Sequence, residues 1–93
     1  MKQLKEISNI LSVTDDQKII EKFLICLLTP KEIDEISLRW ELVKLLNEGM
    51  PQRKISEKLG VSLCKITRGS RELKKKGSAF KYMIDIQDSI KKN

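Results

Sequence analysis

The side chains best suited to chemistry in this sequence are basic and polar groups of the kind that recognise nucleic acid. They gather in and just after residues 49–70, where helical spacing turns five of them outward: Gln52, Arg53, Lys65, Thr67 and Arg71. Guanidinium and ammonium groups neutralise backbone phosphates, and a guanidinium also matches the edge of guanine in the major groove. These residue types therefore indicate a DNA-contacting surface, with a solvated basic face as the alternative.

Residues suited to catalysis or metal binding are sparse. The chain has no histidine, and its two cysteines, Cys26 and Cys64, lie far apart, so no metal site is expected. No partner base that would activate Cys64 as a nucleophile is visible in the sequence. We therefore expect no enzyme activity and two free thiols in a cytoplasmic protein.

The basic residues are positioned by a predicted helix-turn-helix over residues 49–70. Ile55 faces inward, Ser56 is small enough to let two helices cross closely, and Gly60 can adopt the left-handed conformation that ends a helix. Ser62 would then cap the second helix. We interpret this pattern as a DNA-reading head, and an ordinary helical hairpin is the alternative.

Positive charge belongs to the same part of the chain. The formal net charge is +6. Residues 1–49 hold seven Lys or Arg against nine Asp or Glu, a net of −2, whereas residues 50–93 hold twelve against four, a net of +8. This asymmetry is typical of a phosphate-binding surface.

Helical periodicity predicts further helices before the head. The first covers residues 2–11, and the second starts at Thr14, which would form a capping box with Gln17. The later half of the second helix is apolar on every side, so a partner subunit is expected to bury it. We therefore expect a homodimer.

A third helix has a sharp predicted start. Thr29 would cap it, Pro30 would occupy its first position and Glu32 would close a capping box, and the helix would continue to Asn47. A last helix would be capped by Ser78. No strand-like alternation and no apolar run of membrane-spanning length occurs, so we predict an all-α fold and no membrane partner.

The 93-residue length predicts one domain. Within it, residues 1–49 and 78–93 are expected to form a dimerisation core, and residues 50–76 a helix-turn-helix head. A chain of this size buries only a modest core by itself, which again favours association.

Three segments carry a resemblance to a known family. They are Leu-Thr-Pro-x-Glu at residues 28–32, Gln52-Arg53, and Ile66-Thr67-Arg68-Gly69-Ser70. Together they resemble the bacterial Trp repressor family, over about residues 27–74. The resemblance implies a six-helix intertwined homodimer that binds double-stranded operator DNA and uses L-tryptophan, a small amino acid ligand, as corepressor.

The resemblance also implies a tryptophan pocket walled by two arginines. Arg39 and Arg68 would sandwich the indole ring, since a guanidinium plane stacks on an aromatic face. Arg68 would also pair with the ligand carboxylate, assisted by Thr29 of the partner subunit, and Gly69 would leave room for the ring. For Arg39, the residues alone leave open a surface ion pair with Glu35.

The remaining implied ligand contacts concern the ammonium group. Main-chain carbonyls around Cys26 and Leu28 would receive it. The family's pocket serine aligns with Glu72, a departure that leaves two outcomes open. The Glu72 carboxylate would either hold the ammonium more tightly or pair with Arg68 and close the site, which would favour another ligand or none.

The predicted DNA contacts combine base reading with phosphate binding. Arg53 is the expected reader of a guanine, and the other residues supply phosphate, base or water-mediated contacts. Lys65 and Arg71 stand where the family has a threonine and an asparagine, and both add charge toward DNA. The full predicted set is Gln52, Arg53, Ser56, Leu63, Cys64, Lys65, Thr67, Arg71 and Lys74.

The predicted function is that of a sequence-specific transcriptional repressor whose operator binding L-tryptophan promotes. A second hypothesis is a ligand-independent helix-turn-helix module, either a constitutive regulator or part of a transposition system. A third is a protein-interaction domain with an incidental basic face. Affinity for operator with and without tryptophan separates the first two, and the salt dependence of DNA binding tests the third.

Overall fold

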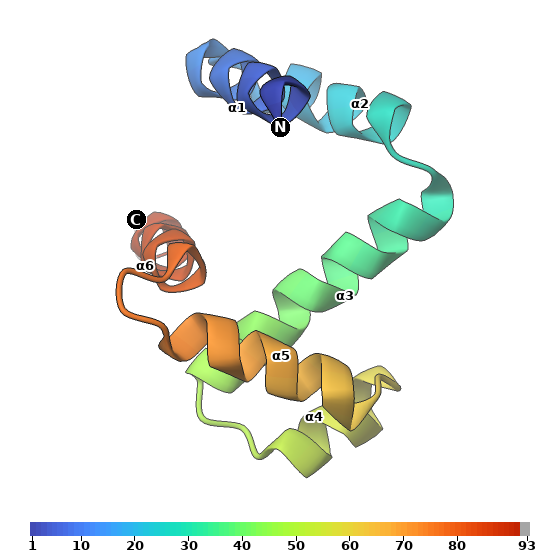
Figure 1. The fold of residues 1–93 in the computed structure, drawn as a ribbon, viewed down its shortest axis with the longest axis vertical. Helices are drawn as coiled ribbons and strands as arrows, with labels where there is room; N and C mark the ends of the chain where they lie inside the picture. The colour runs from blue at the N-terminus through green and yellow to red at the C-terminus, as the bar shows by residue number, and fades with distance from the viewer. Residues whose placement is uncertain (92–93) are drawn as a thin grey trace. The chain divides into compact units, whose positions relative to one another are not determined.

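The computed structural model describes residues 1–91, and these form six α-helices and no strand (Figure 1). The all-α prediction is confirmed. The helices are α1 (Lys2–Val13), α2 (Gln17–Leu27), α3 (Pro30–Asn47), α4 (Gln52–Leu59), α5 (Leu63–Lys74) and α6 (Ala79–Lys91).

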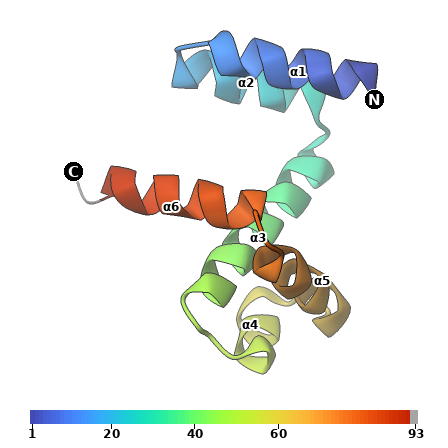
Figure 2. The ribbon, with the colours of Figure 1, turned by 60° about the vertical axis from the view of Figure 1, so that its left-hand side comes forward.

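The chain divides into two compact units, Met1–Glu35 and Ile36–Asn93, with the boundary inside α3. In the first unit the chain reverses after α1, and α2 runs back in the opposite sense (Figure 2). The second unit contains the remainder of α3 with α4, α5 and α6. The division into a dimerisation core and a DNA-reading head stays a prediction.

The start of α2 differs from the prediction. Its N-cap is Asp16, whose carboxylate accepts hydrogen bonds of 3.0 and 3.4 Å from the backbone N–H groups two and three residues further on. Thr14 is instead the C-cap of α1, and its hydroxyl donates to the Ile10 carbonyl at 2.7 Å. The predicted capping box of Thr14 with Gln17 is wrong because an aspartate caps more strongly than a threonine and carries charge toward the positive helix end.

The start of α3 is as predicted. The Thr29 hydroxyl accepts a hydrogen bond of 3.1 Å from the Glu32 N–H, and the Glu32 carboxylate accepts one of 2.9 Å from the Thr29 N–H. The bond from the Thr29 backbone, and after it the Thr29 side chain, lowers the pKa of Glu32. Both partners of the capping box are therefore satisfied when Glu32 is ionised.

The core of the second unit joins the end of α3 to α4 and α5. Half-buried Leu46, Met50, Leu59 and Val61 pack against its central cluster. Each fully buried aliphatic side chain contributes about 1.5–3 kcal/mol relative to an exposed one. The buried cluster consists of Leu42, Leu45, Ile55 and Ile66.

The turn between α4 and α5 has the geometry that the sequence predicts. Gly60 ends α4 in the left-handed conformation, with a φ of 66°. The Ser62 hydroxyl accepts a 3.3 Å hydrogen bond from the Lys65 N–H and caps α5. The Ser56 hydroxyl donates to the Val61 carbonyl at 2.7 Å, so it fixes the turn from the α4 side. The predicted helix-turn-helix is confirmed.

A second tight connection directs α6. Gly77 has a φ of 72°, and the Ser78 hydroxyl accepts a 3.3 Å hydrogen bond from the Lys81 N–H, as the predicted cap requires. The Lys81 ammonium donates to the Asn47 side-chain oxygen at 3.2 Å. This hydrogen bond ties the first turn of α6 to the end of α3.

Apolar surface is abundant on α1, α2 and α6. Neither α1 nor α2 contains a buried residue, and α6 buries only Ile84. From the sequence we predicted that a partner subunit buries the apolar end of α2. In the single chain, Ile25 and Leu27 of this segment are 58% and 48% exposed. Such surface is available for burial against a further protein surface.

Candidate ligand cavity and nucleic-acid interface

A cavity of about 650 Å³ lies in the second unit, walled by α3, α5 and the start of α6. Its walls combine apolar side chains, which suit an aromatic ring, with several charged groups that could orient one. The lining residues are Leu38, Arg39, Leu42, Val61, Lys65, Arg68, Gly69, Glu72, Lys75, Lys76, Gly77, Ser78, Ala79 and Phe80.

One face of α5 supplies much of the charged wall. Lys65, Arg68, Gly69 and Glu72 follow the spacing i, i+3, i+4 and i+7, which places residues on one side of a helix. The opposite wall contains Arg39 from α3. Arg39 and Arg68, 29 positions apart in the sequence, therefore line the same space.

Gly69 is buried where α5 crosses α3. A Cβ added to it would lie 3.4 Å from Leu42 Cδ2, 3.5 Å from Leu46 Cδ1 and 3.7 Å from Val43 Cγ2. These are ordinary van der Waals distances, so an alanine would also fit between the two helices. That Gly69 leaves room for a ligand ring stays a prediction.

Positive charge dominates the cavity. Glu72 is the one carboxylate among its lining residues, against five cations. Those cations are Arg39, Lys65, Arg68, Lys75 and Lys76. The wall thus favours a ligand that carries an anionic group.

Glu72 forms an ion pair with Lys75, the residue that follows the last residue of α5. The Lys75 ammonium donates to Glu72 Oε1 at 2.9 Å, and this hydrogen bond is the main cause of a lowered Glu72 pKa. Partial burial opposes the shift, and the charges of Lys75, Arg68 and Arg71 add to it. A pair of Glu72 with Arg68, one of the two outcomes left open above, is not among the ion pairs of residues 1–91, where Glu72 pairs with Lys75 one turn further on.

The two arginines take part in no ion pair among residues 1–91. The ion pairs there join Lys44 to Glu41, Lys75 to Glu72 and Lys81 to Asp85. The suggested surface pair of Arg39 with Glu35 is not among them. Both guanidinium groups therefore remain available to a ligand in the cavity.

The other predicted ligand residues belong to the first unit. Cys26 and Leu28 lie at the end of α2, and Thr29 caps α3. Leu28 is half-buried, whereas Cys26 and Thr29 are exposed. The cavity described above is formed by residues of the second unit alone.

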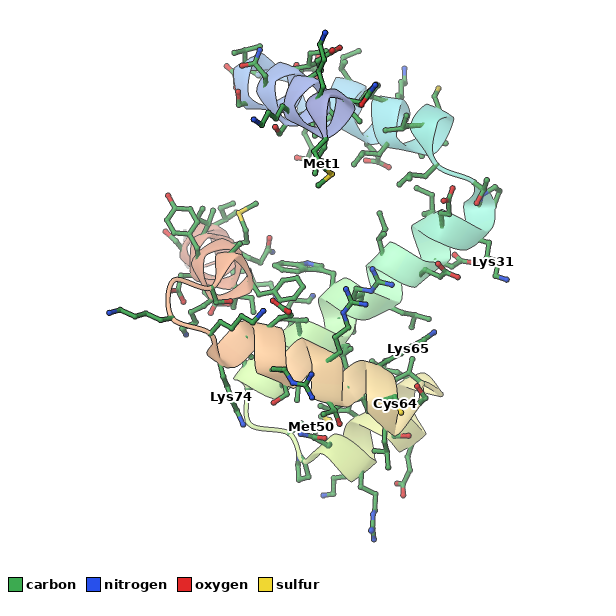
Figure 3. All side chains as sticks on the ribbon, in the orientation of Figure 1. Met1, Lys31, Met50, Cys64, Lys65 and Lys74 are labelled. Atoms are coloured by element: carbon green, nitrogen blue, oxygen red, sulfur yellow. The ribbon has the colours of Figure 1, made fainter. Side chains whose placement is uncertain are left out.

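The predicted DNA-contacting residues lie on α4 and α5, and all but one of them are exposed. Figure 3 places Cys64 and Lys65 toward the beginning of α5 and Lys74 toward its end. The exception is Ser56, which is half-buried and whose hydroxyl is engaged by the Val61 carbonyl. The structure therefore gives Ser56 a role inside the turn.

Several lining residues were not predicted from the sequence. Lys75, Lys76 and Phe80 join the cavity because Gly77 reverses the chain and brings the start of α6 beside α5. Leu38 precedes Arg39 on α3. Lys65, predicted as a DNA contact, also lines the cavity, and the α5 spacing that it shares with Arg68 and Glu72 would have identified it.

The described part of the chain lacks two further kinds of feature. Residues 1–91 contain no group of three or more His, Cys, Asp or Glu side chains placed to hold a metal ion. None of their helices is long and apolar enough to cross a membrane.

A basic helix-turn-helix beside a charged cavity defines a class of protein, the DNA-binding transcriptional regulators. Comparison with known families agrees with this class. The family model described as Trp repressor protein matches residues 2–88, and the chain belongs to this family. The family is regulatory and DNA-binding rather than enzymatic, so the chain is a DNA-binding repressor.

Relatives agree with the assignment over most of the chain. A Trp operon repressor homolog of Haemophilus influenzae is 34% identical over 95 aligned positions, covering 100% of this chain and 94% of the relative. A Trp operon repressor homolog of Vibrio parahaemolyticus is 37% identical over 83 residues, covering 88% and 81%. No solved structure gives a significant match.

Proposed function

We propose that this repressor binds operator DNA as a homodimer and that L-tryptophan promotes the binding. The observation that carries the proposal is the joint placement of Arg39 and Arg68 in the wall of one cavity, outside any ion pair among residues 1–91. Two guanidinium planes on either side of a flat ring gain from stacking and from attraction to the ring quadrupole. Arg68 would pair with the ligand carboxylate.

The other ligand contacts in this proposal bind the ring, the carboxylate and the ammonium group of tryptophan. Gly69 gives the ring access to the α5 backbone, and Thr29 of the partner subunit assists Arg68 at the carboxylate. Backbone carbonyls around Cys26 and Leu28 receive the ammonium, since a carbonyl oxygen accepts hydrogen bonds from a cation.

The position of the cavity supports a coupling of ligand to DNA. Lys65 and Arg68 line the cavity from the same helix that exposes Thr67 and Arg71. A ligand held between α3 and α5 would favour one orientation of α5, and it would act through its higher affinity for the DNA-binding state. In a dimer the two heads would then fit successive major grooves.

On DNA, Arg53 is proposed to read a guanine from the start of α4. Lys65 and Thr67 supply base or water-mediated contacts, while Gln52, Arg71 and Lys74 hold phosphates. The exposed Leu63 and Cys64, at the beginning of α5, lie against the duplex in this arrangement.

The test is selection of a duplex from a random pool in the presence of L-tryptophan, followed by affinity measurement with and without the ligand. The proposal predicts saturable tightening by tryptophan of at least about tenfold, the range typical of allosteric coupling. A ligand-independent helix-turn-helix module would give the same affinity in both conditions. Binding to random duplex that does not weaken as the salt concentration rises would favour a protein-interaction domain, because binding through phosphates must weaken with salt.

A further inference from the structure

The cavity carries more positive charge than the proposed ligand can use. Five cations against one carboxylate give its lining side chains a formal net charge of +4. An amino acid zwitterion has no net charge, so its binding leaves this excess in place. A cleft lined by charges of one sign concentrates ions of the opposite sign. The excess therefore indicates that the cavity also attracts an anion.

The excess charge extends to the end of the cavity beside the α5–α6 turn. From Arg68 to Lys74, the last residue of α5, the helix rises by roughly 9 Å. Lys76 and Ser78 follow that end of the helix and line the cavity from the turn. In tryptophan the ammonium stands on the same carbon atom as the carboxylate. A molecule whose carboxylate pairs with Arg68 therefore brings no negative charge to the turn.

Two side chains at the turn have hydrogen-bond donors to spare. Lys76 belongs to none of the ion pairs among residues 1–91. The Ser78 hydroxyl accepts the capping bond from the Lys81 N–H, which leaves the hydroxyl proton free to donate. The turn between them is open, because a Cβ added to Gly77 would meet no atom within 4 Å. An ammonium and a hydroxyl donor on an open turn suit an oxyanion.

We propose that this end of the cavity is a second binding site, separate from the tryptophan site, for a small oxyanion of the phosphate class. Lys76 supplies a compact point charge, and Ser78 donates a hydrogen bond to one of the anion's oxygens. Lys75 stays paired with Glu72. The inference goes beyond the proposed function and does not depend on it, because neither Lys76 nor Ser78 contacts tryptophan in that proposal.

A phosphate of the DNA backbone is the other source of this chemistry. The predicted phosphate contacts of α5 are Arg71 and Lys74, and neither lines the cavity. In Figure 3 the Lys74 side chain points away from α6. Lys76 and Ser78 line the cavity together with the start of α6. This placement favours a free anion over the DNA backbone.

The experiment follows the backbone amide signals of the isotope-labelled, full-length protein by NMR during titration with inorganic phosphate, with chloride at equal ionic strength as the reference. Saturable shifts are expected at Gly77 and Ser78 with phosphate alone. Lys76→Met removes the charge of an exposed side chain, so the fold should persist and phosphate should bind about fivefold to tenfold more weakly. Lys76→Arg keeps the charge and should retain most of the affinity.

Two further variants separate this site from its surroundings. Lys58→Met is the matched control, because Lys58 is an exposed lysine of the second unit that does not line the cavity. It should keep the wild-type affinity for phosphate. Arg68→Ala removes a cation about one Debye length away, so it should weaken phosphate binding by less than about twofold.

Three results would overturn the inference. Shifts with chloride as large as those with phosphate would show general screening of charge. A loss of phosphate affinity in Arg68→Ala equal to that in Lys76→Met would place the anion at the arginines. An unchanged affinity in Lys76→Met would remove Lys76 from the site.

Titration with a duplex of random sequence at several salt concentrations distinguishes the two sources of phosphate. Wild type and Lys76→Met should show the same dependence of affinity on salt. A salt slope smaller by about one in Lys76→Met would assign Lys76 to the DNA backbone and overturn the free-anion site. The proposed binding of tryptophan and operator would stand in each of these cases, since its own tests use other residues.

Discussion

The two compact units differ in how far their own side chains complete them. The second unit, Ile36–Asn93, encloses a core in which Ile55 and Ile66 are fully buried. The first unit, Met1–Glu35, has helices of similar apolar content, yet α1 and α2 bury no residue. The helix-turn-helix is therefore stabilised by its own core, whereas the apolar faces of α1 and α2 need another surface to cover them.

The largest effect is expected inside the second unit. Ile66→Ala should lower the free energy of unfolding by about 2–5 kcal/mol, because it removes a fully buried side chain and leaves a cavity between the helices. Chemical denaturation followed by circular dichroism measures the loss. A loss of unfolding free energy below about 1 kcal/mol would mean that this core is not what stabilises the second unit.

The next effect belongs to the first unit and depends on association. Ile25→Asp should destabilise the protein by about 2–4 kcal/mol if a second copy buries α2, since a charge would then lose its water. The unfolding temperature of the wild-type protein should rise with protein concentration, and sedimentation should show a dimer.

Leu63→Asp is the control for that prediction. Leu63 is 54% exposed in the second unit, close to the 58% of Ile25, and its substitution should change stability by less than about 0.5 kcal/mol. Equal, small effects of both substitutions would remove the distinction between the two units.

A smaller effect is expected on the exposed face of the second unit, where a substitution should change DNA binding rather than stability. Arg53→Ala should weaken binding to the selected operator by about 1–3 kcal/mol and relax specificity at one base pair. Fluorescence anisotropy with operator and random duplexes measures both. Lys58→Ala, an exposed cation on the same helix outside the predicted contacts, is the control. An unchanged ratio of operator to random binding would exclude Arg53 as a base reader.

The smallest effect concerns the capping box at the end of the first unit. The lowered pKa of Glu32 means that its carboxyl group loses a proton more readily in the folded protein than in the unfolded chain. Its contribution to stability is therefore present above the unfolded pKa of about 4.5 and is lost as the pH falls through the lower, folded value. The gap in unfolding temperature between wild type and Glu32→Ala should shrink below pH 4.5. A gap independent of pH would contradict the role of the charge.

Local rules predicted most of the fold. The caps at Thr29, Ser62 and Ser78 and the left-handed turn at Gly60 follow from single residues and their nearest neighbours, and the structure has all four. The start of α2 was mispredicted because two residues that can cap a helix, Thr14 and Asp16, lie two positions apart, and the stronger cap, Asp16, is the one the structure uses.

The candidate site was predicted less completely. Arg39 and Arg68 came from the resemblance to a family, and no spacing rule connects residues so far apart on different helices. Lys75 and Phe80 were missed because their place in the cavity depends on the reversal at Gly77, a tertiary effect. Lys75 was also missed as the partner of Glu72, although the two residues stand three positions apart.

Calorimetric titration of wild-type protein and Arg68→Ala with L-tryptophan tests the proposed tryptophan site directly, and Arg71→Ala is the control on the same helix. Arg71 is exposed and does not line the cavity. We expect saturable binding of L-tryptophan by wild type and Arg71→Ala, and an affinity at least about tenfold lower for Arg68→Ala with its fold intact. Normal tryptophan binding by folded Arg68→Ala would contradict it.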